Sequence, residues 1–305
     1  MRLNDEILSD LTWLVEGKIV IHKKKLLSRW NENVFYGKQQ FLPKHWREAA
    51  VKLIKNHEKN LRELKLLLDL RHPNIVQLYE AGEYHGDVVD YIYIVMELCG
   101  QNLRSFVNEN SFNFPRAFSF SKQPTAGLSF LHKNKVAHRD LKPDNVLISF
   151  CKEFLKLSDF GLSKQIPSGR SAATATAISA GTDGYRAPET YQPHTRLSLS
   201  IDIFPYGLVT HFLFTNGKHP FGSNPNEWSF NIMKSQNLNL SLIPTFGEPN
   251  SPMRAQLVDL LHRTLQHEPG DRPTAEQIGK HAFFAGDIFP SKVYRVFRVF
   301  YNVVY

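Results

Sequence analysis

Short runs of β-branched and aromatic residues in the first third of the chain predict strands. Residues 18–22 (KIVIH), 49–54 (AAVKLI) and 91–95 (YIYIV) are runs of this kind, and the third alternates as a half-buried strand does. Between the second run and the third, leucines recur at helical spacing over residues 61–68, until residues 72–74 (HPN) interrupt the pattern. We therefore expect a small β-rich part with helical sequence between its strands.

The remaining two thirds of the chain carry mainly helical patterns. In residues 256–266, four leucines recur on one helical face. A small β-rich part followed by a larger helical part is typical of an α+β fold, and we expect the join near residues 97–100. No segment of about 20–50 residues repeats, which excludes a solenoid.

Composition narrows the class of protein. The 305 residues suffice for one large domain or for two small lobes that share a cleft. Hydrophobic residues make up 42% and charged residues 22%, which predicts a packed core rather than disorder. The two cysteines, Cys99 and Cys151, lie far apart and without metal-ligand spacing, so we expect neither a disulfide framework nor a zinc site, and a reducing compartment.

Apolar stretches and charge indicate a cytoplasmic chain with no membrane span. The apolar stretch over residues 91–99 is far shorter than the roughly 20 residues that cross a bilayer, and the first six residues lack the build of a signal peptide. The net charge of +8 is dispersed, and its densest run is residues 22–25 (HKKK). A solvated basic surface explains this charge more simply than an RNA or a phosphorylated partner does, and we expect no direct contact with DNA.

The strongest chemical signal is a set of motifs in fixed order. Residues 138–145 read HRDLKPDN, and residues 159–161 (DFG) begin nineteen positions after Asp140. Residues 187–189 (APE) follow, while upstream Lys52 ends a predicted strand and Glu63 lies on the next predicted helix. Taken singly, each motif could be an ordinary turn or a surface charge. Turns and surface charges do not, however, explain why the motifs follow one another in this order along the chain. The set resembles the motifs of protein kinases, and it implies a bilobal protein kinase fold of the α+β class.

The resemblance implies a role for each residue of the catalytic set. Phosphoryl transfer depends on positioning and on charge stabilisation. Asp140 would orient the attacking hydroxyl and accept its proton, and Lys142 would neutralise charge on the moving phosphoryl group. Asn145 and Asp159 would hold Mg²⁺ through oxygen ligands, as a hard cation prefers.

The same resemblance implies an ATP site. Lys52 would contact the phosphates while Glu63 holds its ammonium, Met96 would line the back of the adenine pocket, and the backbone of Glu97 and Cys99 would bind the adenine edge. The implied nucleotide-binding set is Leu27, Phe35, Lys52, Glu63, Met96, Glu97, Cys99 and Asp159.

Further positions suggest the acceptor and the regulation. Lys142, together with Gly181 and Thr182 ahead of Tyr185, resembles serine/threonine rather than tyrosine kinases. Arg139 could pair with a phosphate on the segment 162–186 and so order it. Six hydroxyl residues of that segment are candidate phosphorylation sites, although a flexible linker explains them equally well: Ser163, Ser168, Ser171, Thr174, Thr176 and Ser179.

Four residues are implied to be structural. His138 would brace the catalytic loop, and Asp202 would hold the backbone of that loop. Glu189 and Arg272 would form a buried ion pair in the large lobe.

Other stretches resemble one branch, the unfolded-protein-response sensor kinase/endoribonucleases (inositol-requiring enzyme) and their relative ribonuclease L. These stretches are residues 93–99, 144–149, 181–189, 202–204, 217–222 and 280–284. In that family a nuclease domain follows the kinase, and nucleotide binding drives a back-to-back homodimer that cleaves RNA. The resemblance therefore implies a kinase that acts on itself or on another protein, on the cytosolic face of the endoplasmic reticulum if the chain is part of a longer protein.

The resemblance also divides the chain. Residues 1–26 would be an N-terminal extension, and residues 27–284 the kinase domain, with its lobes over 27–97 and 100–284. Residues 285–305 would be a tail or the truncated start of a nuclease domain, too short for a nuclease site, so RNA would be reached only through a missing or a partner domain. Arg295, Arg298 and Asn302 form a polar stripe on a mostly apolar helical pattern in this tail, which we expect to dock on the large lobe.

Five positions depart from the kinase pattern. The glycines of the phosphate-binding loop would fall at Ser28, Trp30 and Asn33, which weakens the grip on phosphate and leaves open a pseudokinase-like module that binds nucleotide and dimerises without useful transfer. Pro124 is expected to kink a helix over residues 121–132 or to mark its start. Pro205 is expected in the first turn of its helix, where proline is tolerated.

Overall fold

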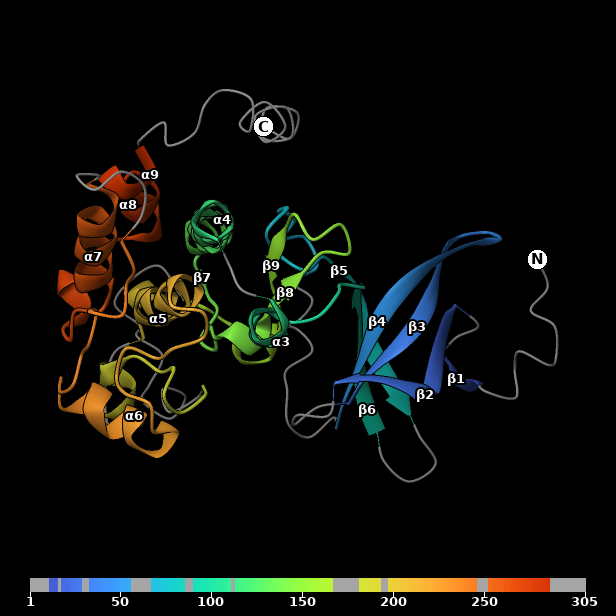
Figure 1. Cartoon of the computed structure of the whole chain (residues 1–305). Coiled ribbons are helices and arrows are strands. Elements are labelled where there is room, and N and C mark those ends of the chain that lie inside the picture. The colour runs from blue at the N-terminus through green and yellow to red at the C-terminus, as the bar shows by residue number, and fades with distance from the viewer. Residues whose placement is uncertain are drawn as a thin grey trace.

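A β-sheet at the N-terminal end of the chain and a helical part at the C-terminal end lie side by side in the computed structural model (Figure 1). The α+β prediction is confirmed. The structure describes residues 11–15, 18–28, 33–55, 67–85, 90–110, 113–166, 181–192, 197–245 and 252–285.

The sheet is antiparallel and six-stranded, with the order β1-β2-β3-β4-β6-β5. Its strands are β1 (Leu11–Val15), β2 (Ile19–Ser28), β3 (Asn33–Leu42), β4 (His45–Lys55), β5 (Leu78–His85) and β6 (Asp90–Glu97). All three strands predicted from the sequence are present, as parts of β2, β4 and β6.

The two faces of the sheet serve different purposes. One face carries a closed apolar cluster that includes Phe35 of β3 and Val51 of β4. Ile54, Ile92 and Ile94 instead join the apolar core that continues into the helical part. Because successive side chains of a strand alternate between faces, Lys52 lies on the face opposite to Val51, toward the helices.

The helical part is built around buried helices. Its α-helices are α3 (Leu103–Glu109), α4 (Phe114–Lys133), α5 (Ile203–Phe214), α6 (Pro225–Met233), α7 (Met253–Thr264), α8 (Ala275–Gly279) and α9 (Ala282–Ala285). Every residue of α5 is buried, and α4 packs against α5 and α8. The predicted helix over 256–266 corresponds to α7, whose Leu257, Leu260 and Leu261 are fully buried.

The two prolines behave differently. Pro205 lies in the first turn of α5, as predicted. Pro124 lies inside α4, so the alternative that it marks a helix start is wrong. The helix begins ten residues earlier because the Asn113 side chain caps it, accepting a hydrogen bond from the Arg116 N–H at 3.1 Å, and Pro115 fits the first turn.

The join between sheet and helices is held by backbone hydrogen bonds. Between the end of β6 at Glu97 and the start of α3 at Leu103, the Gly100 N–H donates to the Ile148 carbonyl at 2.8 Å. The Ile148 N–H donates in turn to the Gln101 carbonyl at 3.0 Å. Ile148 belongs to β8 (Val146–Ile148), which pairs with β9 (Leu155–Leu157), so the segment after β6 is docked on this hairpin.

Within the described part of the chain, no helix has the length and apolar character that crossing a membrane requires.

Candidate active site

The loop that carries HRDLKPDN lies between β7 (Val136–Ala137) and β8, and a buried carboxylate holds its backbone. Asp202, fully buried at the N-terminus of α5, accepts the N–H groups of His138 and Arg139, each at 2.8 Å. Arg139 has a φ of 71°, a left-handed conformation that costs free energy for a non-glycine residue. Burial alone would raise the pKa of Asp202, but the hydrogen bond and the charge of His132 together with the loop N–H groups lower it. Asp202 therefore stays ionised and holds the loop in a strained shape, as predicted.

His138 braces the loop from inside. Its side chain is completely buried, and Nε2 lies 2.9 Å from the Ser158 carbonyl oxygen. Nδ1 accepts the Asp140 N–H at 3.3 Å. The tautomer is therefore the one with its proton on Nε2, and the ring is a structural link as expected.

Asp140 is almost buried, and three neighbours hold its carboxylate. Asn145 Nδ2 donates to Oδ2 at 2.8 Å, and Lys142 Nζ lies 3.0 Å from the same oxygen. Thr182 donates to Oδ1 from its backbone N–H at 3.0 Å and from its hydroxyl at 2.8 Å. Lys142 also donates to the Thr182 hydroxyl, so the catalytic loop and the segment after residue 180 meet at one carboxylate.

Lys52 and Asp159 come together from positions 107 residues apart. Lys52 Nζ lies 2.7 Å from Asp159 Oδ1, and the lysine is only 5% exposed. Asp159 adopts a left-handed conformation with a φ of 61°, and the same oxygen accepts the Gly161 N–H at 3.3 Å. A buried ammonium beside a partly exposed carboxylate is an arrangement that can bind a phosphate and a cation together.

The β8–β9 hairpin brings together Asn145 and Asp159, the two residues expected to bind the cation through oxygen atoms. The Ser158 N–H and its hydroxyl both donate to the Asn145 carbonyl, each at 2.9 Å. Asp159 follows Ser158 directly, so Asn145 and Asp159 lie at the same end of the hairpin.

The motifs are parts of a larger match. Residues 37–284, more than half of the chain, match the model of the protein kinase domain. The chain belongs to the protein kinase family.

The kinase domain is similar to several kinase/endoribonucleases. It is 32% identical over 92% of the chain to serine/threonine-protein kinase/endoribonuclease IRE2 of Homo sapiens and covers 30% of that protein. It is 30% identical to IRE1b of Arabidopsis thaliana, over 77% of the chain and 30% of the relative, and 32% identical to ire-1 of Caenorhabditis elegans, over 78% and 25%. These similarities confirm the predicted branch. The chain thus spans less than a third of the length of each of these relatives.

The strand register places one expected nucleotide contact, Met96, on the sheet face of Lys52 and another, Phe35, on the opposite face. Met96 pairs with Ala50 and shares the sheet face of Lys52, while Leu27 is half exposed near the end of β2. Phe35 pairs with Val51 and is buried in the cluster on the opposite face, so the structure does not bring it to this site.

Val34 takes the position expected for Phe35, because it pairs with Lys52 and therefore shares its face. The pairing of β2 with β3 shifts register between Leu26 and Ser28. The pairing of β3 with β4 sets the face of each β3 residue and puts Phe35 opposite Val51, and a preceding loop without glycines gave no sequence signal for this register. Counting alternate positions back from Lys52 across the hairpin would have found Val34.

Glu97 ends β6, and Cys99 lies two residues further on. The Glu97 N–H donates to the Gln77 carbonyl at 2.8 Å, and its carboxylate lies 3.0 Å from Lys156 Nζ. Burial, and then the charge of Glu97, raise the pKa of the Cys99 thiol to about 12. Cys99 is therefore a neutral thiol at physiological pH and not a reactive nucleophile.

The predicted ion pair between Glu189 and Arg272 is present. Two parallel hydrogen bonds of 2.8 and 2.7 Å join the groups, and the arginine side chain has no exposed surface. The same guanidinium donates to the carbonyls of Ser200, Gln266 and His267. It therefore ties four segments of the helical part together.

Ser163 is not an exposed modification site, contrary to its place among the candidate hydroxyls. Its side chain is buried, and its hydroxyl donates to the His138 carbonyl at 3.2 Å. The other five candidate hydroxyls, together with Glu63 and Trp30, lie outside the described residues.

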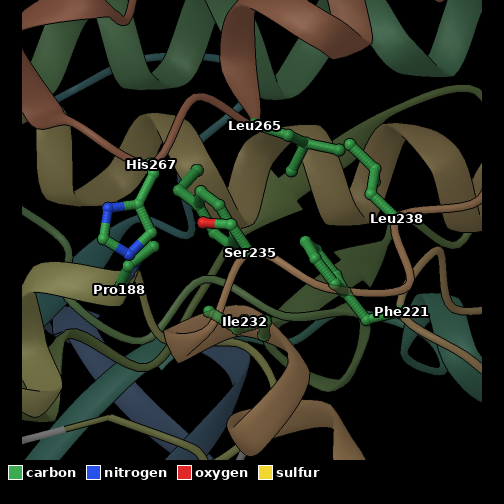
Figure 2. Close-up of a pocket in the computed structure, with 8 residues that line it drawn as sticks. Pro188, Phe221, Ile232, Ser235, Leu238, Leu265 and His267 are labelled. Carbon is green, nitrogen blue, oxygen red and sulfur yellow. The ribbon is translucent and has the colours of Figure 1, made fainter.

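A small apolar cavity elsewhere in the helical part is not a competing site. Figure 2 shows it among α5, α6 and the end of α7, lined by Pro188, Phe204, Phe221, Ile232, Ser235, Leu238, Leu265 and His267. Its volume of about 40 Å³ has room for a few water molecules at most. It is too small for a nucleotide.

Proposed function

We propose that this kinase domain transfers the γ-phosphoryl group of ATP to serine or threonine hydroxyls, beginning with its own. The arrangement of Asp140 carries the proposal, because both oxygens of a nearly buried carboxylate are held by Lys142, Asn145 and Thr182. Such a carboxylate keeps one orientation and can align an approaching hydroxyl.

The residues present fit Mg²⁺ as the resident cation. Asn145 Nδ2 donates to the carboxylate and to the carbonyl of Asp140, so the amide oxygen is the Asn145 atom suited to a cation. Asp159 supplies a partly exposed carboxylate. Protein Mg²⁺ sites next to phosphates commonly use one or two such ligands, and the bound ion would neutralise charge on the phosphates.

The remaining groups divide the work of positioning. Lys52 would hold the phosphate oxygens with an ammonium that the sheet keeps out of water. Lys142, which reaches both Asp140 and Thr182, would stabilise charge on the transferring group near the acceptor hydroxyl. Asp140 would accept the hydroxyl proton as the new bond forms.

Autophosphorylation is the direct test. Purified protein incubated with Mg²⁺ and [γ-³²P]ATP should incorporate label, chelation of the metal should stop it, and mass spectrometry should locate phosphate among Ser168, Ser171, Thr174, Thr176 and Ser179. If folded protein that binds ATP incorporates no label, the proposal is contradicted. Label on tyrosine alone would also contradict it.

A second candidate is a nucleotide-binding module that regulates a partner, such as a homologous endoribonuclease, without useful transfer. It is favoured by Ser28, Trp30 and Asn33 at the positions of the loop glycines, where phosphate needs close approach of backbone N–H groups. β2 ends at Ser28 and β3 begins at Asn33, while Trp30 lies outside the described residues.

Restoring glycine at these positions distinguishes the two candidates. If the altered loop is what prevents transfer, the triple variant Ser28→Gly, Trp30→Gly, Asn33→Gly should raise ³²P incorporation by about 10²-fold or more, because loss of one preorganised donor costs about 10²–10³ in rate. A triple variant with alanine is the matched control. An unchanged rate in the glycine variant would count against the second candidate.

We further propose that nucleotide promotes self-association of this kinase domain on the cytosolic side of a membrane system, in keeping with the branch it resembles. Sedimentation velocity with and without Mg·ATP should then show a concentration-dependent dimer. A monomer under both conditions would exclude this part of the proposal.

A further inference from the structure

Arg104, in the first turn of α3, grips the catalytic loop from outside the active site. Its Nε lies 2.9 and 3.0 Å from the two carboxylate oxygens of Asp144, and NH2 donates to Oδ2 at 2.9 Å. Asp144 stands between Lys142 and Asn145, in the turn Pro143–Asn145. Each of the two side chains is only about one-third exposed, so solvent screens this ion pair less than it screens a pair on the open surface.

The same guanidinium reaches the segment that follows residue 180. NH2 donates to the Tyr185 hydroxyl at 3.3 Å, and the group lies 5.7 Å from the centre of the Tyr185 ring and 5.4 Å from that of Phe212 in α5. Burial lowers the pKa of Arg104, but the bonds to Asp144 and Tyr185 outweigh it and raise the pKa above its ordinary value. The Arg104 guanidinium therefore connects α3 to both the catalytic loop and Tyr185.

The segment Thr182–Tyr185 is anchored on its other side by α6 and the residues before it. His219 Nε2 lies 3.0 Å from the Gly184 carbonyl oxygen, and the Gly184 N–H donates to the Ser229 hydroxyl at 3.0 Å. The His219 ring stacks on Trp228 with centroids 3.9 Å apart. Burial lowers the pKa of His219 to about 3, so this link is neutral and does not change near physiological pH.

We propose that Arg104 is a positioning residue for the acceptor protein. An acceptor hydroxyl has to reach Asp140, and Thr182, which opens the segment, already touches that carboxylate. We therefore expect the acceptor chain to pass along Thr182–Tyr185. Arg104 links this segment, through Tyr185, to Asp144 of the catalytic loop. This inference rests on the proposed transfer to serine or threonine.

The chemistry of arginine is required at this position. A planar guanidinium can bind both oxygens of Asp144 and still donate to Tyr185, whereas a lysine ammonium offers a point charge without the fork. Arg104→Lys should therefore rescue only part of what Arg104→Gln loses.

Kinetics separate positioning from a general structural effect. The acceptor is an Asp140→Asn copy of the full chain that carries a size tag, and label on it is measured against acceptor and ATP concentration. Arg104→Gln is expected to raise the KM for this acceptor about tenfold, with the KM for ATP within about twofold of wild type, because misplacing a positioning group weakens one binding step. Equal rises in both KM values, or none, would overturn the inference.

Hydrogen exchange tests the link without any transfer. In Arg104→Gln the amides of Thr182, Gly184 and Tyr185 should exchange at least about tenfold faster, with those of α7 unchanged. The control is Arg263→Gln, which removes an exposed pair with Asp259. Exchange equal to that of the control would refute the role of Arg104. If wild-type protein transfers no phosphate, the proposed function fails, while this exchange result still decides whether Arg104 orders the segment.

Discussion

Replacement of Asp140 by asparagine is expected to reduce the rate of phosphoryl transfer by about 10²–10⁴-fold, the range for loss of a general base. The substitution keeps the shape of the side chain and removes the proton acceptor. ATP binding should change little, because Asp140 contacts Lys142, Asn145 and Thr182 rather than Lys52. The rate is measured by ³²P incorporation and ATP affinity by calorimetry.

A matched control lies in α7. Asp259→Asn makes the same chemical change at a carboxylate whose side chain is 49% exposed and paired with Arg263. It should leave the transfer rate within about twofold of wild type, since exposed pairs contribute little. Transfer that persists in a clean preparation of Asp140→Asn would remove Asp140 from the mechanism.

Replacement of Arg272 by alanine is expected to reduce the free energy of unfolding by about 3–5 kcal/mol. The substitution leaves the Glu189 carboxylate buried without its counter-ion, and it also removes the donors to the Ser200, Gln266 and His267 carbonyls. The loss is read from chemical denaturation followed by circular dichroism.

Two further variants isolate the cause of this loss. Arg263→Ala removes an exposed arginine paired with Asp259 and should cost less than about 1 kcal/mol. Arg272→Met combined with Glu189→Leu should recover a large part of the loss, because the uncompensated charge is then absent. If Arg272→Ala reduces the free energy of unfolding no more than Arg263→Ala does, the Glu189–Arg272 pair does not stabilise the fold as a buried ion pair should.

Most of the fold and the chemistry of this kinase domain could be predicted from local sequence. Alternating β-branched residues predicted three strands, and leucine spacing predicted α7, because both patterns report which face of an element is buried. The order of the motifs around Asp140 and Asp159 indicated phosphoryl transfer. This reaction needs a proton acceptor and cation ligands at spacings that a loop and a hairpin can bring together.

Errors arose where a position depends on partners distant in sequence. Phe35 was assigned to the nucleotide, but the register between β3 and β4 places it in the opposite cluster and puts Val34 beside Lys52. Ser163 was counted with the hydroxyls of an open segment, but it is buried against the His138 carbonyl. Pro124 suggests a helix start only if the Asn113 cap eleven residues upstream is overlooked.

The sequence by itself determined which chemical groups the protein has and in what order they occur, because residue type and local periodicity are properties of neighbouring positions. The tertiary structure alone decided which of them meet. Lys52 reaches Asp159 across 107 residues, and Arg104 reaches both Asp144 and Tyr185, through distances that no local pattern encodes. Such contacts follow from the packing of the sheet against the helices, where burial of apolar faces sets the position of every polar group between them.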